Sequence, residues 1–136
     1  IRLLTKQYNQ MICISSEIQA IVKKSGIQNG LITIQTMHTT TGIMMNEQLE
    51  CLESDIQCFF DELVPEEKAY AHARMLDDYG STAGNPTGHL KSILCGNHCH
   101  LFLVDGEIVK GGAQEVYFVE LDGPAQRKVL VMIAEL

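Results

Sequence analysis

Residues 98–136 read HCHLFLVDGEIVKGGAQEVYFVELDGPAQRKVLVMIAEL, and this stretch decides the fold class. Four segments rich in β-branched and aromatic residues follow one another in it, and turn sequences such as Asp105-Gly106 and Asp122-Gly123-Pro124 separate them. Short segments of this composition, joined by such turns, are typical of antiparallel strands. We therefore expect three or four antiparallel strands, over residues 100–104, 107–110, 113–121 and 127–136.

The N-terminal part of the chain predicts further strands. Residues 31–38, LITIQTMH, follow an Asn29-Gly30 turn and alternate in polarity, which indicates a strand that brings His38 to its end. Residues 1–8 and 11–15 are also rich in β-forming residues and flank a turn at residues 9–10. We expect these two strands to pair as a hairpin.

Helical spacing of apolar residues predicts three helices. The first covers residues 16–25, the second covers residues 48–63 and stops before Pro65, and the third starts at Asn85-Pro86 and closes at Gly96. We expect the apolar stripes of the last two helices to be buried, namely Leu52, Ile56, Phe59, Phe60, Leu63, Leu90, Ile93 and Leu94. The elements together predict an α+β fold with a mixed, largely antiparallel sheet and about three helices.

Length and charge limit the function classes. A chain of 136 residues is the usual size of one domain, so we expect a single domain over residues 1–136. Its 10 basic and 17 acidic side chains give a formal net charge of -7, which repels nucleic acid and anionic membranes. No apolar run approaches the roughly 18 residues of a membrane span. The five cysteines are an odd number without a disulfide-framework spacing, which favours a reducing cytoplasm.

Three histidines in polar segments are the first candidates for chemistry. His38, His72 and His89 could bind a divalent ion or transfer protons together with Asp77 or Asp78, since imidazole does both near neutral pH. No H-E-x-x-H or C-x-x-C pair accompanies them, so only the fold can bring them together. Unconnected surface or capping histidines are the alternative.

The segment His38-Thr39-Thr40-Thr41-Gly42 places three hydroxyls and a glycine after a strand. Hydroxyls and free backbone N–H groups can hold a phosphate or carboxylate, so this segment is a candidate anion site. The alternative is a threonine run that continues the strand into a bulge at Gly42. Asn46-Glu47 could face the same pocket or simply begin the next helix.

The segment Cys95-Gly96-Asn97-His98-Cys99-His100 concentrates thiols and imidazoles. On a strand, His98 and His100 share one face while Cys99 lies on the other, so the group cannot all bind one ion without distortion. The remaining cysteines fall in periodic segments and are interpreted as small core residues. A cysteine nucleophile is not supported.

The order of these motifs resembles the YjbQ-like family, whose function is uncharacterised. The resemblance rests on HTTTG with Asn46-Glu47, a His-containing segment that ends at Asp77-Asp78, Asn85 with His89, and then V-D-G-E-I, G-x-x-Q and D-G-P with Arg127. It spans nearly the whole chain. It implies a compact α+β homotrimer around a threefold axis, with a pocket of histidines and acids near the subunit interfaces.

The resemblance also implies which residues form that pocket. It points to His38, Glu47, His72, Asp78, Asn85 and His89 as pocket residues, and to Gln114 and Glu120 as polar positions on the closing strands. Members of the family are often named secondary thiamine-phosphate synthases, which would join a pyrimidine diphosphate to a thiazole phosphate.

The chain departs from the family pattern at two positions. Ala113 stands where the family usually has Trp in G-T-W-Q, and Ala125 stands where an Arg usually follows D-G-P. With the first change an aromatic wall of the site is missing or replaced, and the second change leaves Arg127 as the only nearby guanidinium. We expect substrate choice and any bidentate phosphate contact to be affected.

These observations favour an enzyme that acts on a small anionic or phosphorylated molecule, in which the histidines and Asp78 either hold a divalent metal such as Zn²⁺ or Mg²⁺ or transfer protons. Its candidate catalytic residues are His38, Glu47, His72, Asp78 and His89, its candidate metal ligands are His38, His72, Asp78 and His89, and its candidate substrate-binding residues are Thr39, Thr40, Thr41, Asn85, Gln114 and Arg127. A non-catalytic trimer that binds a metal or an anion is the alternative. In a third reading the polar cluster only organises the subunit interface.

Overall fold

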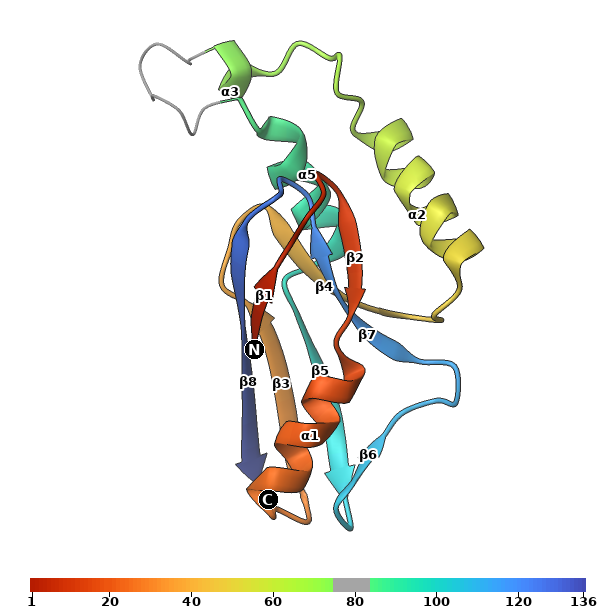
Figure 1. Ribbon diagram of the computed structural model, residues 1–136, viewed down its shortest axis with the longest axis vertical. Helices are drawn as coiled ribbons and strands as arrows, with labels where there is room; N and C mark the ends of the chain where they lie inside the picture. Colours follow the sequence, from red (N-terminus) through yellow and green to blue (C-terminus); the bar gives the residue numbers. More distant parts are fainter. Residues whose placement is uncertain (75–83) are drawn as a thin grey trace.

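The computed structural model describes residues 1–74 and 84–136, which form two sheets and four helices (Figure 1). The elements in chain order are β1 (Arg2–Leu4), β2 (Gln10–Cys13), α1 (Ser15–Ser25), β3 (Gly30–Thr36), β4 (Thr41–Asn46), α2 (Glu50–Leu63), α3 (Ala71–Arg74), α5 (Pro86–Cys95), β5 (His98–Val104), β6 (Glu107–Val109), β7 (Glu115–Glu120) and β8 (Gln126–Glu135). None of the described helices is both long enough and apolar enough to cross a membrane.

The strands form a five-stranded sheet in the order β1-β8-β3-β5-β6 and a three-stranded sheet in the order β2-β7-β4. Every strand pair in both sheets is antiparallel, so the expected α+β fold with largely antiparallel sheets is confirmed. The expected N-terminal hairpin is wrong, because β1 pairs with β8 and β2 pairs with β7 in the other sheet. The chain crosses between the sheets at Thr5, whose N–H donates to Ala125 O at 2.9 Å.

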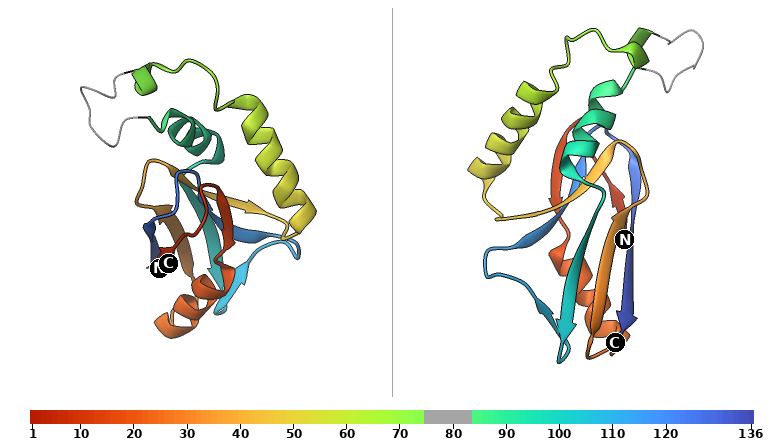
Figure 2. Two further views of the ribbon diagram at one scale, coloured as in Figure 1. Left: turned by 45° about the horizontal axis from the view of Figure 1, so that its top comes forward. Right: turned by 180° about the vertical axis from the view of Figure 1, so that it is seen from behind.

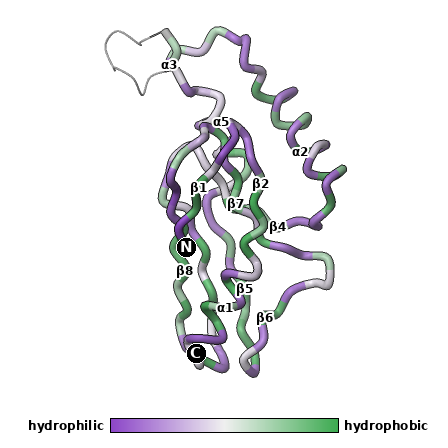
Figure 3. The backbone as a smooth tube through the Cα atoms, viewed as in Figure 1, coloured by the Kyte–Doolittle hydropathy of each residue, from purple (hydrophilic) through white to green (hydrophobic). Residues whose placement is uncertain are grey.

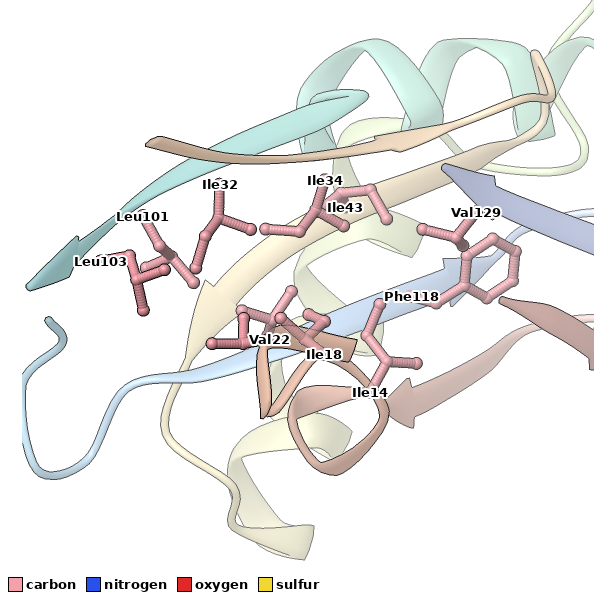
Figure 4. Close-up of a cluster of buried hydrophobic side chains, with 11 residues drawn as sticks. Ile14, Ile18, Val22, Ile32, Ile34, Ile43, Leu101, Leu103, Phe118 and Val129 are labelled. Carbon is pink, nitrogen blue, oxygen red and sulfur yellow. The ribbon is translucent and has the colours of Figure 1, made fainter. Parts of the chain in front are cut away.

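The main core lies between the inner faces of the two sheets and α1 (Figure 4). Ile32 and Ile34 of β3 point into it in the alternation that the sequence predicts for this strand. Ile18 and Val22 come from α1, and Phe118 comes from β7. A shared core of this kind makes the two sheets one packing unit.

A second cluster lies on the outer face of the three-stranded sheet, beneath α2. Phe60 and Ile56 of α2 pack against Tyr117 and Val119 of β7. The phenol of Tyr117 donates to Glu53 Oε1 at 2.7 Å, which fixes the helix on this sheet. Seen from behind in Figure 2, α2 stands at the side of the molecule, joined to the sheets through the chain that follows β4.

The outer face of the five-stranded sheet is covered by no described element. Phe102 of β5 and Leu130 and Met132 of β8 lie on it with more than half of each side chain exposed. Monomeric proteins rarely leave neighbouring large apolar side chains on one flat face without a use for them. This face is called the open sheet face below.

The expectation that the apolar stripes of the second and third helices are buried is wrong for most of their residues. In α2, Phe60 is buried, whereas Phe59 is 55% exposed and Leu63 is 53% exposed. In α5, Ile93 is 77% exposed, and Leu90 and Leu94 are exposed as well. Figure 3 shows that hydrophobic and hydrophilic residues alternate along α2.

The small and polar face of α5 is buried instead, since close contacts with β4 and the 121–122 segment require it. The hydroxyl of Ser92 donates to Thr41 O at 2.6 Å. A Cβ on Gly88 would lie 2.8 Å from Leu121 O, so only glycine allows this approach. The apolar side chains of α5 therefore face away from the core.

Lys91 on α5 is a buried cation that ties this helix to the end of α2. Only 1% of its side chain is exposed, and its Nζ lies 2.6 Å from Asp61 Oδ1 and 3.3 Å from Glu66 Oε1. Burial alone would lower the pKa of Lys91, but hydrogen bonds to the two carboxylates outweigh it and raise this pKa. The same pairing lowers the pKa of Asp61 despite its partial burial.

Glu120 at the end of β7 is a fully buried carboxylate that joins β1, β7 and β8. Arg127 donates to it from Nε at 2.7 Å and from Nη2 at 2.8 Å, and Thr5 donates from Oγ1 at 2.8 Å. The N–H groups of Leu121 and Asp122 donate to Oε1. Burial would raise the pKa of Glu120, but these partners outweigh it and lower the pKa below its ordinary value.

Replacement of Glu120 by Gln should reduce the free energy of unfolding by about 3 kcal/mol at pH 7, because the Arg127 guanidinium loses its paired charge. Since the folded pKa of Glu120 is lowered, its contribution is complete above the pKa of the unfolded carboxyl and is lost as the pH falls through the folded pKa. Urea unfolding between pH 7 and pH 3 measures both effects. The Glu67→Gln variant, at an exposed carboxylate, is the matched control. Equal stability of Glu120→Gln and the parent at pH 7 would rule out this role.

Candidate functional site

Two imidazoles from separate helices meet in a cleft beside α5. His72 lies on α3 and His89 on the first turns of α5, and their ring centroids are 5.3 Å apart with the rings 75° to each other. The cleft has a volume of about 450 Å³ and is lined by Tyr70, Ala71, His72, Pro86, His89 and Leu90. We call it the histidine cleft.

Asn85 and Asp122 determine the tautomer of His72. The amide Nδ2 of Asn85 donates to Asp122 Oδ2 at 2.7 Å, and a carboxylate can only accept, so the amide oxygen must face His72. That oxygen lies 2.9 Å from His72 Nε2. Neutral His72 therefore carries its proton on Nε2 and keeps the lone pair on Nδ1, which can accept a proton or bind a metal ion.

Asn85 directly precedes α5 at the expected N-cap position, and Pro86 follows at the start of the helix. Its side chain makes no capping hydrogen bond. The amide is engaged by His72 and Asp122 instead, so this residue serves the cleft rather than the helix end. The backbone O of Asn85 still accepts from His89 N and so keeps the first turn closed.

A second, larger cleft lies where β1 and β8 meet the turn between β3 and β4. It has a volume of about 560 Å³ and is lined by Arg2, Leu3, Leu4, His38, Gln126, Arg127 and Lys128. Arg2 and Lys128 are direct partners in the antiparallel register and are both exposed. Three of the ten Lys and Arg residues of an acidic chain thus line one cleft, which we call the basic cleft.

His38 is held in the basic cleft as a neutral ring. The backbone N of Lys128 donates to His38 Nε2 at 2.9 Å, so the ring carries its proton on Nδ1. Burial and the nearby Arg127 charge, with a lesser contribution from Lys128, lower the pKa of His38 and outweigh the opposite effect of Glu120. At pH 7 this ring is a neutral N–H donor beside two cations.

The 120–127 segment connects the two clefts. Arg127 Nη2, fixed by Glu120, also reaches Thr40 Oγ1 at 3.3 Å and Asp122 O at 3.4 Å. Asp122 in turn holds Asn85 of the histidine cleft. Asp122 is therefore bonded both to the Arg127 guanidinium of the basic cleft and to the Asn85 amide that orients His72 in the histidine cleft.

Comparison with known proteins gives the chain a family. A sequence model described as UPF0047 protein YjbQ-like matches residues 1–135. The chain belongs to the YjbQ-like UPF0047 family. It is 30% identical to a UPF0047 protein of Methanothermobacter thermautotrophicus over 132 residues, which are 97% of this chain and 87% of that protein.

Solved structures of the family show the same fold. A YjbQ/UPF0047 family protein of Clostridium acetobutylicum is 31% identical and superposes with a TM-score of 0.88, with 98% of each chain covered. A protein of Sulfolobus solfataricus, described as YbjQ-like and of unknown function, is 30% identical with a TM-score of 0.90 and covers 100% of this chain and 94% of its own. The family relationship thus identifies the fold, while no activity comes with it.

The structure brings together part of the candidate set inferred from the resemblance to this family. His72 and His89 line the histidine cleft, with Asn85 bonded to His72, whereas His38 and Arg127 line the basic cleft. Asp77 and Asp78 lie outside the described residues. Within residues 1–74 and 84–136, no three His, Cys, Asp or Glu side chains are grouped closely enough to hold a metal ion.

The threonine segment is mostly engaged in internal contacts. Thr40 and Thr41 are buried, and the Thr41 hydroxyl bonds to Thr36 Oγ1. Thr39 alone of the three is exposed. Gly42 forms no bulge, because β4 runs in regular register with β7, and a Cβ at this position would overlap the Cys95 thiol.

Two candidates inferred from the family resemblance lie elsewhere on the single chain. Glu47 is exposed just after the far end of β4, roughly 20 Å from Thr41 by the usual rise per residue. Gln114 lies in the turn before β7, where its Oε1 accepts from Gly111 N at 2.7 Å. Ala113, in the place of the family Trp, is exposed in the same turn.

Three residues of the two clefts stand in no sequence motif. The sequence places Asp122 in a turn and does not reveal that its carboxylate accepts from Asn85. For Arg2 and Lys128 the only signal in the sequence is their place in two predicted strands, which the structure pairs directly.

Ala125, in the place of the family Arg, contacts Thr5 through its backbone: its N–H donates to Thr5 Oγ1, and its carbonyl accepts from Thr5 N.

The imidazole tautomer of His72 can be measured directly. Long-range ¹H–¹⁵N spectra at pH 8 should show His72 protonated on Nε2 and His38 protonated on Nδ1, because their partners are an amide oxygen and a backbone N–H. The Asp122→Asn variant frees the Asn85 amide to turn and should mix the two His72 tautomers while leaving His38 unchanged. A proton on His72 Nδ1 in the parent would contradict the proposed Asn85 orientation.

Proposed function

We propose that the chain is an enzyme that acts on a small phosphorylated molecule with the help of a divalent metal ion held by His72 and His89. The observation that carries this proposal is the Asp122–Asn85–His72 chain of hydrogen bonds, which orients the His72 imidazole next to that of His89. A half-buried amide and carboxylate that fix one ring nitrogen, as Asn85 and Asp122 do here, are the usual support of a histidine that ligates a metal ion.

The donor set of the histidine cleft suits zinc better than magnesium. Imidazole nitrogen is a borderline ligand that Zn²⁺ accepts readily, whereas Mg²⁺ prefers oxygen ligands. His72 and His89 would hold the ion, with the rest of its coordination open to water or substrate. When bound, the ion would polarise a phosphoryl oxygen or lower the pKa of a water molecule.

An anionic substrate is supported by the basic cleft. Arg2 and Lys128 place two exposed cations side by side, and the neutral His38 ring adds an N–H donor. Phosphate and carboxylate groups bind where such donors converge. Because Asp122 bonds to Arg127 and to Asn85, an anion in the basic cleft and a reacting group in the histidine cleft would be held by one connected set of residues.

Turnover of the two thiamine precursors, a pyrimidine diphosphate and a thiazole phosphate, tests the activity after which family members are often named. We expect weak turnover with zinc, and a kcat/KM lower by about 100-fold in His72→Ala and His89→Ala. Arg2→Gln and Lys128→Gln should raise KM with less effect on kcat, because the Arg2 and Lys128 side chains would bind the substrate without taking part in the chemical step. The His98→Ala variant, at an exposed histidine outside both clefts, is the control.

Product that never exceeds one equivalent of protein would exclude this reaction. Unchanged rates in both His72→Ala and His89→Ala would exclude the histidine cleft as the catalytic site.

A non-catalytic protein that binds a metal or a small anion is the second candidate. One observation favours it: apart from the two imidazoles and the Tyr70 phenol, the histidine cleft is lined by the apolar residues Ala71, Pro86 and Leu90. Such a lining suits binding, while it offers few groups to stabilise a charged transition state. Saturable binding without turnover would support this candidate.

We further propose a homotrimer located in the cytoplasm. The open sheet face and the exposed apolar residues of α5 support an assembly, because both would gain free energy from burial against another chain. A reducing compartment is supported by the five cysteines, all unpaired.

Sedimentation velocity should give three times the chain mass of 15.1 kDa at micromolar concentration. The Phe102→Asp and Leu130→Asp variants should lower this mass, because each places a charge on the open sheet face. The Glu107→Gln variant, at an exposed position on the edge strand β6, should leave it unchanged. A parent protein that sediments as a monomer would contradict the trimer.

A further inference from the structure

Residues 65–72, which we call the strap, lead from the end of α2 into α3 and carry one wall of the histidine cleft. In Figures 1 and 2 the strap passes over α5. Within the described part of the chain, side-chain hydrogen bonds join the strap to other segments at two residues, Glu66 near its start and His72 at its end. The contacts of Glu66 therefore bear on where His72 lies.

The Glu66 carboxylate is bonded to α5 through two buried side chains. Its Oε2 accepts from Thr87 Oγ1 at 2.9 Å, and its Oε1 accepts from Lys91 Nζ at 3.3 Å. The Tyr8 phenol donates to the same carboxylate at 3.3 Å. Thr87 and Lys91 stand two positions before and two positions after His89, so Glu66 is fixed to the turns of α5 that carry the second imidazole. Hydrogen bonds to a charged group are stronger than neutral ones.

The strap is closed on itself between Glu66 and His72. The hydroxyl of Tyr70 donates to Pro65 O at 2.8 Å, and Lys68 N donates to the same oxygen at 3.4 Å. A compact turn packed by its own side chains transmits a displacement along the chain better than an extended segment does. A shift of Glu66 would therefore move Tyr70 and His72, which line the cleft.

Lys91 has a second carboxylate partner, which separates the role of Glu66 from the stability of the fold. Asp61 Oδ1, on α2 and outside the strap, lies 2.6 Å from Lys91 Nζ, closer than Glu66. Loss of Glu66 leaves this buried ammonium paired with Asp61, so it does not create the unpaired buried charge that destabilises a fold strongly. What it removes is the link between the strap and α5.

From these contacts we propose that Glu66 is a positioning residue of the histidine cleft: it holds the strap on α5 and thereby brings the His72 ring to His89. In the described part of the chain Glu66 does not line the cleft, so it acts through the strap. Without Glu66, the strap keeps the neutral bond from His72 to Asn85 and the packing of α3 on α5. The consequence for activity rests on the proposed function, whereas the placement of the ring does not.

Ring placement is measured on the metal-free full chain by nuclear magnetic resonance. The parent should give a nuclear Overhauser cross-peak between the ring protons of His72 and His89, since the ring centroids are 5.3 Å apart. Glu66→Ala should lose this cross-peak and show a mixture of His72 tautomers, because the bond that selects one tautomer is made less often. Thr87→Val, which removes only the hydroxyl that donates to Glu66, should weaken the same cross-peak.

Asp61→Ala is the matched control, since it removes the other carboxylate of the same lysine. It should lower the urea midpoint of unfolding at least as much as Glu66→Ala, yet keep the cross-peak and the single tautomer of His72. A purely structural role of Glu66 predicts instead that the cross-peak follows stability in both variants. Loss of the cross-peak in Asp61→Ala would therefore overturn the proposal.

Zinc titration of the same proteins separates this proposal from the proposed function. Glu66→Ala should bind Zn²⁺ about tenfold more weakly than the parent, with Asp61→Ala close to the parent. A parent that shows the cross-peak, loses it in Glu66→Ala and binds no zinc would refute the metal site and uphold the positioning role. An unchanged cross-peak and tautomer in both Glu66→Ala and Thr87→Val would overturn the positioning role, as would a parent without the cross-peak.

Discussion

The buried carboxylate of Glu120 is the interaction on which the rest of the structure depends. A fully buried charge is stable only when its oxygens are paired, and Glu120 achieves this with Arg127, Thr5 and two backbone N–H groups. These partners bring β1, β8 and the following turn to the end of β7. They also fix Arg127 next to Thr40 and Asp122. The Glu120–Arg127 ion pair therefore helps to position residues of both clefts.

Much of the secondary structure could be predicted because it is encoded locally. The alternation of β3 and the Asp105-Gly106 turn between β5 and β6 are short-range patterns, and the structure contains both. Which face of a helix is covered is not encoded locally. In α5, Gly88 and Ser92 allow the helix to approach the 121–122 segment and β4 closely. These contacts outweigh the free energy that burial of the apolar residues of α5 would contribute.

The sequence predicts which types of residue form the candidate site, but it does not predict how the fold arranges them. Imidazoles at His72 and His89 stand 17 positions apart, and only α3 and α5 bring their rings to 5.3 Å. His38 is polar and near a strand end, but its partner is the backbone of Lys128, which no local pattern reveals. A turn aspartate such as Asp122 becomes an orienting group only when α5 delivers Asn85 to it.

The central claim is that the histidine cleft holds a metal ion between His72 and His89. Crystals grown with Zn²⁺ and measured above and below the zinc absorption edge test it most directly. The account predicts an anomalous peak within bonding distance of one nitrogen of each ring. Well-ordered rings of His72 and His89 with no zinc between them would contradict it.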